Sequence, residues 1–287
     1  MEQFRRGPLT FDVREGGPAD GEPVVLLHGF PQDKDSWKHI EPLLHEAGLR
    51  TFVFDQRGYS PGARPKGRRE YTGDKLATDV IALLDAAGLE WAHIVGHDWG
   101  GGVAWGVATN YADRVRSVTV LSTPHPGALV EAGRKSSQAL KSWYMFAFQL
   151  PWLPEVVVSN RRVADGLKRS GLPAEHAEHN ARLMAQPGAA TGAVNWYRGL
   201  PFTMREPVRR TSVPTTYVWG SRDAYLGRYA AEHTADWVTG PYRFVEVDGH
   251  HWLPETQPQR MAELITEQVT AAAEQPGETG QPRAGAA

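Results

Sequence analysis

The run Trp91-Ala92-His93-Ile94-Val95-Gly96-His97-Asp98-Trp99-Gly100-Gly101-Gly102 decides the fold. The mostly apolar residues from Trp91 to Val95 predict a buried strand, and a helix is expected from Gly100 to Tyr111. A sharp turn between a strand and a helix lifts one side chain above the sheet, and glycines let the backbone pass closely there. Asp98 occupies that position. Because a Gly-x-Asp-x-Gly pattern also matches by chance, its surroundings have to support it.

Segments with strand character alternate with segments of helical character along most of the chain. This alternation predicts a mostly parallel sheet flanked by helices, an α/β fold, because each parallel return needs a crossover long enough to hold a helix. The expected strands are residues 9–14, 24–27, 50–54, 91–95, 115–121, 215–219 and 242–247, and the expected helices are 35–47, 72–87, 100–111, 226–238 and 256–273.

The pattern changes between Pro124 and Pro214, where helical stretches are broken by prolines and no convincing strand occurs. We interpret this part as an inserted helical lid, whose tryptophans and methionines would suit an apolar pocket. For most of these residues, packing of the lid onto the core is the simpler explanation. The expected division is a core of residues 1–124 and 214–274, a lid at 125–213, and a disordered tail at 275–287 that is rich in Gly, Pro, Gln and Ala.

The composition favours an enzyme or binding protein for small molecules. The chain has 287 residues, of which 41% are hydrophobic, and its 31 basic and 33 acidic residues nearly balance. No overall charge favours nucleic acid or an anionic membrane. The absence of cysteine excludes disulfides, thiolate catalysis and cysteine metal sites. Without a signal peptide or a run of roughly 20 apolar residues, we expect a cytoplasmic monomer or homodimer with no membrane insertion.

Three further motifs follow predicted strands. His28-Gly29-Phe30-Pro31 forms a loop that can aim a backbone N–H at Asp98, Gly220-Ser221-Arg222-Asp223 offers a carboxylate, and Gly249-His250-His251-Trp252 supplies a base. The carboxyl ends of parallel strands meet at one edge of a sheet, where ligands bind. We therefore expect a triad in the order nucleophile, acid, histidine. The spacing does not separate His250 from His251.

An aspartate nucleophile narrows the chemistry to attack on an sp3 carbon that bears a leaving group, because attack on an ester or amide would produce an anhydride. The product is an alkyl ester of Asp98, which water activated by the histidine then hydrolyses. The backbone N–H groups of Phe30 and Trp99 would hold the tetrahedral oxyanion. Epoxides and alkyl halides both fit this scheme, and the other reactant is water.

Over residues 4–270 the chain resembles the α/β-hydrolase fold, and its motifs are similar to those of the epoxide hydrolases of that fold. The resemblance implies that Tyr144 and Tyr197, in Ser142-Trp143-Tyr144 and Asn195-Trp196-Tyr197-Arg198, protonate the epoxide oxygen. It also places the base at His251, directly before Trp252, with Asp223 orienting it. No cofactor and no metal are implied. The expected pocket, suited to a small lipophilic epoxide, is lined by Trp99, Trp143, Phe148, Trp196 and Trp252.

Two alternatives use the same scaffold. Haloalkane and haloacid dehalogenases share the aspartate nucleophile, but the former usually carry asparagine where this chain has Phe30. Fluoroacetate dehalogenases share the His-Gly-Phe-Pro-Gln run through Gln32, but they follow the nucleophile with an arginine for the substrate carboxylate, and residues 99–102 offer none. A non-catalytic binding protein of this fold would commonly have lost part of the triad. An epoxide hydrolase is therefore the favoured prediction.

Several other polar residues have structural explanations. We expect His97 to be a packed core histidine and His28 to brace the oxyanion loop. Asp55 and Arg57 resemble a structural loop motif of the family. His176 and His179 lie three residues apart beside glutamates, which could suggest a metal, but a solvated helix face is the simpler interpretation.

Overall fold

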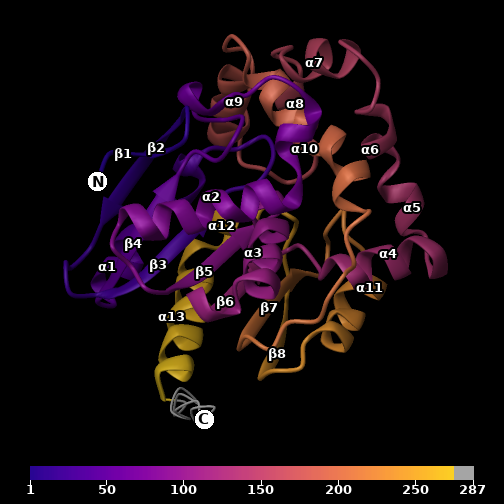
Figure 1. The fold of residues 1–287 in the computed structure, drawn as a ribbon. Coiled ribbons are helices and arrows are strands. Elements are labelled where there is room, and N and C mark those ends of the chain that lie inside the picture. Colours follow the sequence, from indigo (N-terminus) through magenta and orange to yellow (C-terminus); the bar gives the residue numbers. More distant parts are fainter. Residues whose placement is uncertain (275–287) are drawn as a thin grey trace, which may run out of the picture.

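The computed structural model describes residues 1–274, and at its centre lies one eight-stranded sheet (Figure 1). The strand order is β1-β2-β4-β3-β5-β6-β7-β8, with β1 and β2 antiparallel to their neighbours and the other six strands mutually parallel. All six parallel strands therefore end at the same edge of the sheet. The strands are β1 (Gln3–Arg6), β2 (Leu9–Gly16), β3 (Glu22–Leu27), β4 (Leu49–Phe54), β5 (Ala92–His97), β6 (Val115–Leu121), β7 (Thr215–Gly220) and β8 (Tyr242–Val247).

Helices cover both faces of the sheet, so the central strands are apolar on both sides. In β3, Val25 and Leu27 belong to a core cluster shared with α2 and α3, whereas Val24 and Leu26 belong to a second cluster shared with α1 and α13. Alternation along a strand thus fills two separate cores. The helices are α1 (Glu41–Glu46), α2 (Gly73–Ala86), α3 (Trp99–Asn110) and α13 (Pro258–Glu274).

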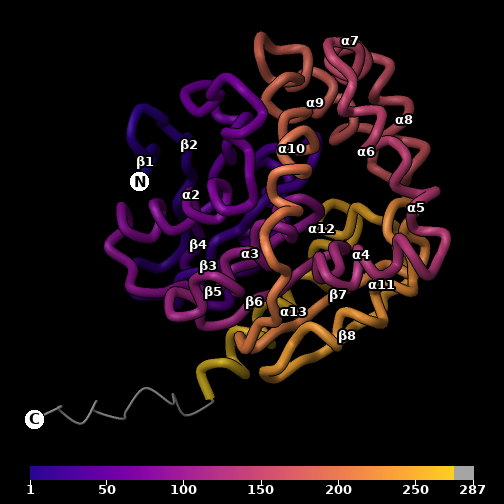
Figure 2. The backbone as a smooth tube through the Cα atoms, turned by 45° about the vertical axis from the view of Figure 1, so that its right-hand side comes forward, coloured from indigo at the N-terminus to yellow at the C-terminus, as the bar shows by residue number. Residues whose placement is uncertain are grey.

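The segment between β6 and β7 contains helices α4 to α10 and no strand beyond an isolated bridge at Thr211, and we call residues 125–213 the helical insertion. Figures 1 and 2 place most of its helices together at one end of the molecule, with α4 and α5 beside α11 (Arg228–Glu232). Its helices are α4 (Pro126–Lys135), α5 (Gln138–Lys141), α6 (Trp143–Ala147), α7 (Leu153–Val158), α8 (Val163–Arg169), α9 (Ala174–Met184) and α10 (Ala189–Thr203).

The helix predicted at 35–47 is wrong in detail, because the structure divides it into a 3-10 turn, Lys34–Trp37, and α1. Pro42 lies in the first turn of α1, where proline is favoured because its missing N–H would have no partner there. The closing helix expected at 256–273 is present as α13, which begins two residues later, at Pro258, and a separate short helix, α12 (Leu253–Thr256), precedes it.

The helix predicted at 226–238 is also shorter than expected. The structure has α11 followed by a 3-10 turn, His233–Trp237. At the junction the hydroxyl of Thr234 donates to the carbonyl of Ala230 at 2.9 Å, a side-chain bond that competes with regular helix geometry. The edge strand β1 was not predicted.

Within residues 1–274, no helix combines the length and the apolar character needed to cross a bilayer. The tail predicted to be disordered, residues 275–287, lies outside the described residues.

Candidate active site

Asp98 lies where β5 ends and α3 begins. Its backbone has a φ of +51°, in the left-handed region that residues other than glycine rarely adopt. The turn is so tight that a Cβ at Gly96 would lie 2.2 Å from the carbonyl oxygen of Gly100, so only glycine fits at position 96. The strand-to-helix turn expected from the sequence is therefore present, and it projects the Asp98 carboxyl from the edge of the sheet.

His251 lies between two carboxylates. Its Nδ1 is 2.8 Å from Oδ2 of Asp223, and its Nε2 is 3.4 Å from Oδ2 of Asp98. The other oxygen of Asp223 accepts hydrogen bonds from the backbone N–H groups of Tyr225 and Leu226, at 2.7 and 3.0 Å. Because an ionised carboxylate only accepts, Nδ1 carries a proton and Nε2 is the nitrogen that faces Asp98.

The side chain of the neighbouring histidine, His250, points away from Asp98 and Asp223. A Cβ built at Gly171, in the helical insertion, would lie 2.8 Å from the imidazole of His250, so this ring packs against the insertion. The structure thus brings His251, and not His250, to Asp98 and Asp223.

Backbone and hydroxyl donors hold Asp98 in place. The N–H of Phe30 donates to Oδ1 of Asp98 at 2.7 Å, and the hydroxyl of Thr123 donates to its backbone carbonyl at 2.7 Å. The N–H of Trp99, the second predicted oxyanion donor, makes no bond to this carboxylate within residues 1–274. It belongs to the first residue of α3, and the first N–H groups of a helix have no partner inside the helix.

Two tyrosines of the helical insertion face Asp98 across a cavity of about 440 Å³. Tyr144 comes from α6 and Tyr197 from α10, and their ring centroids are 6.0 Å apart. Tyr197 also packs edge-on against Phe30, at 5.2 Å. Asp98, His251 and both phenols thus line one chamber.

Trp143, Phe148 and Trp252 line this cavity as predicted, but Trp99 and Trp196 do not. The indole N–H of Trp196 donates to the carbonyl of Arg57 at 2.7 Å, and its ring packs against Trp99. Adjacent residues on a helix point in different directions, so Tyr197 faces the cavity while Trp196 faces the core. The prediction of Trp196 as a pocket residue is therefore corrected, and the Trp99 ring lies behind Tyr197.

Tyr225 is the main cavity residue that the sequence did not reveal. Its ring lies 4.9 Å from the ring of His251 and 6.1 Å from that of Tyr144. Its position two residues after Asp223 was the available signal. The other lining residues that were not predicted are Pro31, Leu140, Lys141, Leu167 and Ala224.

Comparison with known proteins identifies the family of this chain. Residues 22–258 match the family described as alpha/beta hydrolase fold. Human epoxide hydrolase 4 is 33% identical over 271 residues, which cover 90% of this chain and 75% of that protein. The chain belongs to the epoxide hydrolases of the α/β-hydrolase fold.

Two further comparisons cover nearly whole chains. An α/β-hydrolase superfamily protein of Bacillus subtilis, YfhM, is 34% identical, over 90% of this chain and 94% of that protein. The crystal structure of epoxide hydrolase A from Mycobacterium thermoresistibile superposes with a TM-score of 0.79 at 27% identity, covering 93% of this chain and 97% of the other.

The charges in the site of this α/β-hydrolase support an ion pair. Burial would raise the pKa of Asp98, but the hydrogen bond and the charge of His251 outweigh it and hold that pKa below its usual value. Burial would lower the pKa of His251, but the charges of Asp223 and Asp98 raise it well above its usual value. The resting site therefore holds an imidazolium between two carboxylates.

A buried polar chain supports His251 from behind. Nε2 of His97 donates to the backbone carbonyl of His251 at 2.9 Å, and the hydroxyl of Ser122 donates to the same carbonyl at 2.7 Å. Gln32 contacts Nδ1 of His97 with its carbonyl oxygen and donates to Glu255 with its amide. Burial lowers the pKa of His97 to about 4.

The residues expected to be structural make structural contacts. Nε2 of His28 accepts from the N–H of Gln56 at 3.1 Å. Arg57 makes a paired contact with the buried Asp79, both bonds being 2.7 Å. The solvated face expected for His176 and His179 is wrong, because α9 packs against the core there.

His176 is buried against His39, and Nε2 of His179 lies 2.8 Å from Oδ2 of Asp33. Ligand atoms of Asp33, Asp35 and His179 lie within 4.8 Å of one another. However, Oδ1 of Asp35 accepts from Arg14 at 2.7 Å. The group is thus an ion-pair cluster that joins the insertion to the core.

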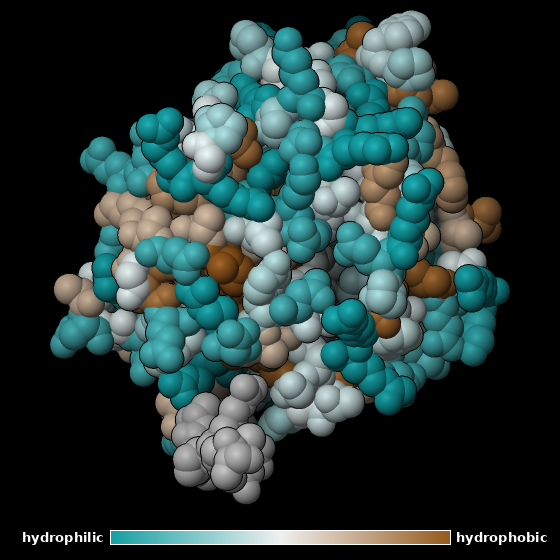
Figure 3. Space-filling model, in the orientation of Figure 1, coloured by the Kyte–Doolittle hydropathy of each residue, from teal (hydrophilic) through white to brown (hydrophobic). Residues whose placement is uncertain are grey.

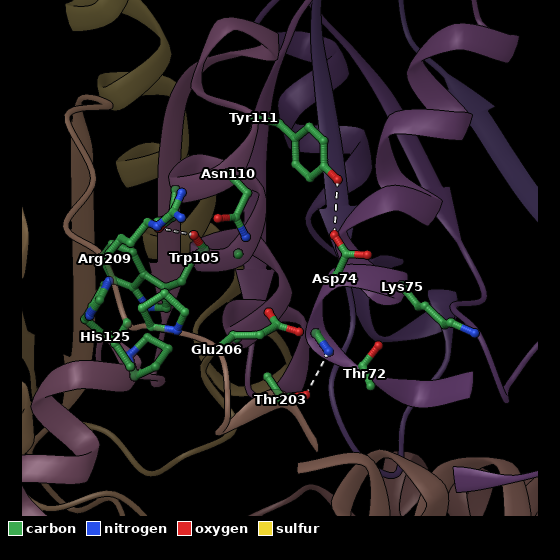
Figure 4. A pocket seen from close by; sticks show the side chains of 17 residues that line it. Thr72, Asp74, Lys75, Trp105, Asn110, Tyr111, His125, Thr203, Glu206 and Arg209 are labelled. Atoms are coloured by element: carbon green, nitrogen blue, oxygen red, sulfur yellow. Dashed lines mark hydrogen bonds between the residues drawn. The ribbon is translucent and has the colours of Figure 1, made fainter. Parts of the chain in front are cut away.

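A second cavity, of about 560 Å³, lies away from this site, between the start of α2, α3, the start of α4 and residues 203–209 (Figure 4). Its polar groups pair with one another: the hydroxyl of Tyr111 donates to Asp74 at 3.3 Å, and the N–H of Gly73 donates to Thr203 at 2.9 Å. It shares no residue with the chamber around Asp98.

Proposed function

We propose that this enzyme hydrolyses a lipophilic epoxide to a vicinal diol through a covalent ester of Asp98. The observation that carries the proposal is the single chamber in which Asp98 and His251 face the phenols of Tyr144 and Tyr197. A nucleophile on one side of the substrate and acids on the other match the needs of ring opening. The relatives named as epoxide hydrolases support the same class of substrate.

In the first step an oxygen of Asp98 bonds to an epoxide carbon while the ring C–O bond breaks. The alkoxide that forms is far more basic than a phenol, so it takes a proton from Tyr144 or Tyr197. Burial raises the pKa of both phenols, so each of them is protonated in the resting site. The imidazolium of His251 then returns a proton to the phenolate and becomes neutral.

In the second step neutral His251 takes a proton from water, and the hydroxide adds to the carboxyl carbon of the Asp98 ester. The N–H of Phe30, and that of Trp99, stabilise the oxyanion, with roughly 3 kcal/mol for each well-placed donor. The oxyanion collapses and expels the diol, which takes its proton from His251. The new carboxylic acid gives its proton back to His251, and the ion pair is restored.

The role of His251 changes because alkylation removes the charge of Asp98. In the resting site two carboxylates favour the imidazolium, whereas in the ester only Asp223 does so. The pKa of His251 therefore falls when the ester forms, which makes a base available for the second step. The helical insertion acts as the lid in this scheme, because it supplies both phenols over the core of residues 1–124 and 214–274.

Halide chemistry fits the chamber less well. A halide leaving group is a weak base that departs without a proton, so the protons of the two phenols in the chamber would have no acceptor in that reaction. A haloacid would also need a cation for its carboxylate. The cationic side chain that lines the chamber, Lys141, donates to the backbone carbonyl of Asp223 at 3.1 Å.

The proposal is tested by a single turnover of enzyme in excess over styrene oxide in ¹⁸O-labelled water, followed by mass spectrometry of the protein and the diol. Because water attacks the ester carbonyl, the label should enter the Asp98 carboxylate first, and the first diol should be unlabelled. Label in the first diol would mean direct attack of water on the epoxide. A parallel incubation with a bromoalkane should give no comparable turnover.

A further inference from the structure

Three short helices of the insertion, α5, α6 and α7, present apolar side chains to solvent. Six large hydrophobic residues there are each at least 55% exposed, and Leu140 reaches 77%. We call these six the apolar face: Leu140, Trp143, Phe146, Trp152, Val156 and Val157. Single exposed hydrophobic residues are ordinary, but a group of this kind marks a surface that contacts something else.

The apolar face is not the outer side of ordinary amphipathic helices. The opposite side of the same segment is apolar too, since Tyr144 and Phe148 line the cavity and Val158 is buried. Helices that are apolar all round are normally covered on every side. Figure 3 shows brown and pale side chains among teal ones along the top and the right-hand edge of the molecule, where Figure 1 places α7, α6 and α5.

The apolar face is continuous with the mouth of the active-site cavity. Leu140 and Trp143 belong to both, since they line the cavity that contains Asp98 and are still 77% and 66% exposed. Whatever binds to the apolar face therefore lies next to the entrance of the cavity.

The charge of the helical insertion indicates what kind of surface the apolar face binds. Residues 125–213 hold twelve Lys and Arg against six Asp and Glu, while the rest of the chain holds 19 against 27. The insertion is therefore basic and the rest of the chain acidic, although the whole chain is nearly neutral. Arg134 precedes the apolar face, and Arg161 and Arg162 follow it; all three are exposed, and none forms an ion pair within residues 1–274. Within the face itself, the acidic Glu155 is paired with Arg198.

We propose that the apolar face docks the enzyme onto an anionic lipid surface, with Trp143, Phe146 and Trp152 in the interface and the flanking arginines against lipid phosphates. Aromatic and aliphatic side chains beside basic residues are the combination that binds such interfaces. A second copy of the chain is disfavoured, because a two-fold contact through this face would set the same unpaired arginines against each other.

Docking has a consequence that rests on the proposed function. A lipophilic epoxide dissolved in the bilayer enters the cavity beside Leu140 and Trp143 without crossing water. The docking itself does not depend on catalysis, so its test measures binding alone.

The test is flotation of the full-length protein with vesicles of phosphatidylcholine, either alone or mixed about three to one with phosphatidylglycerol. The protein should bind the anionic vesicles at least about tenfold more tightly, and added salt should weaken the binding. The variant F146S/W152S/V156S should lose most of the binding, as should R161Q/R162Q. These five residues lie outside the cavity lining, so turnover of soluble styrene oxide should be unchanged.

The matched control is R5Q/K66Q, which removes two exposed cations from the core and should bind vesicles like the wild type. Because the altered side chains are exposed, thermal melts should show that every variant folds. Quenching of tryptophan emission by brominated lipid adds a readout on the wild type, and Trp152→Phe should reduce it.

Three outcomes would overturn the proposal. The wild-type protein could fail to float with anionic vesicles, or the F146S/W152S/V156S and R161Q/R162Q variants could bind these vesicles like the wild type. The third outcome is a wild-type dimer that the F146S/W152S/V156S substitutions convert to a monomer. The last result would assign the face to a second copy of the chain. A wild-type protein that binds anionic vesicles but does not hydrolyse epoxides would instead count against the proposed function alone.

Discussion

Nδ1 of His251 lies 2.8 Å from Oδ2 of Asp223, whose side chain is fully buried. This contact fixes the proton on Nδ1 and turns Nε2 toward Asp98, so that one ring connects the orienting acid to the proposed nucleophile. In the proposed mechanism, Asp98 and the phenols serve ring opening, and the pair of His251 and Asp223 serves ester hydrolysis. Each step can therefore be stopped on its own.

His251→Gln should leave the first step intact and stop the second, because glutamine cannot take a proton from water. Mixing the variant with styrene oxide should give a protein heavier by one substrate mass, measured by intact-protein mass spectrometry. The matched control is His250→Gln, since His250 packs against Gly171 outside the site, and this variant should turn over with modest loss. A trapped ester in the His250 variant together with an active His251 variant would reverse the assignment.

Asp223→Asn should slow ester hydrolysis by about a hundredfold or more and slow alkylation much less, because only the second step needs a base oriented through Nδ1. Rapid-quench measurement of ester formation and decay separates the two rates. No carboxylate follows β6 to substitute for it, since Ser122 and Thr123 donate to the carbonyls of His251 and Asp98 there. Equal slowing of both steps would remove Asp223 from the triad.

Tyr144→Phe and Tyr197→Phe should each slow alkylation by roughly tenfold to a hundredfold, and the double variant should lose about a thousandfold or more, because one remaining phenol can still protonate the alkoxide. The measurement is the single-turnover rate of ester formation. Tyr225→Phe is the control, since its ring lies beside the imidazole of His251. Alkylation at the wild-type rate in the double variant would reduce both tyrosines to packing residues.

Glu255→Gln should make stability less dependent on pH. Burial raises the pKa of Glu255 to about 7, so the folded protein binds this proton more tightly than the unfolded chain does. The contribution of Glu255 to stability is therefore largest at low pH, and it is lost as the pH rises from about 4.5 to about 7. Glutamine is never ionised, so relative to the wild type the variant should gain about 2–3 kcal/mol between pH 5 and pH 8.

Urea unfolding at the two pH values measures this gain. Glu263→Gln, an exposed change in α13, is the control and should show a small difference. A Glu255 variant with the same pH dependence as the wild type would show that the carboxyl is not buried as a neutral acid.

Gly96→Ala should destabilise the fold by about 3 kcal/mol, because its Cβ would lie 2.2 Å from the backbone oxygen of Gly100 and neither segment can move without disturbing Asp98. Gly102→Ala is the matched control in the same turn-helix unit. Its Cβ meets nothing within 4 Å, so the change should stabilise α3 by up to about 1 kcal/mol. Urea denaturation distinguishes the two. Similar stability of both variants would mean that the turn at Asp98 is not tight.

Local sequence was enough for seven of the eight strands and for the position of Asp98. The strands at 115–121 and 242–247 have the predicted bounds, because apolar residues recur along each of them and turn residues limit their ends. The glycines around Asp98 encode the turn through their own lack of a Cβ, which is a property of a few consecutive residues. Helix ends were predicted less well, since α1 begins only at Glu41, inside the segment expected as one helix at 35–47, and α13 begins at Pro258 instead of Thr256.

Tertiary structure decided which way the side chains point. Spacing alone left His250 and His251 equivalent, and only the packing of His250 on Gly171 separates them. Trp196 turns into the core because its indole finds the carbonyl of Arg57, 139 residues away in the chain. The pairing of Gln32 with Glu255 spans 223 residues. Periodicity records only which residues share a face of their own element, whereas the partner of that face depends on how distant elements pack.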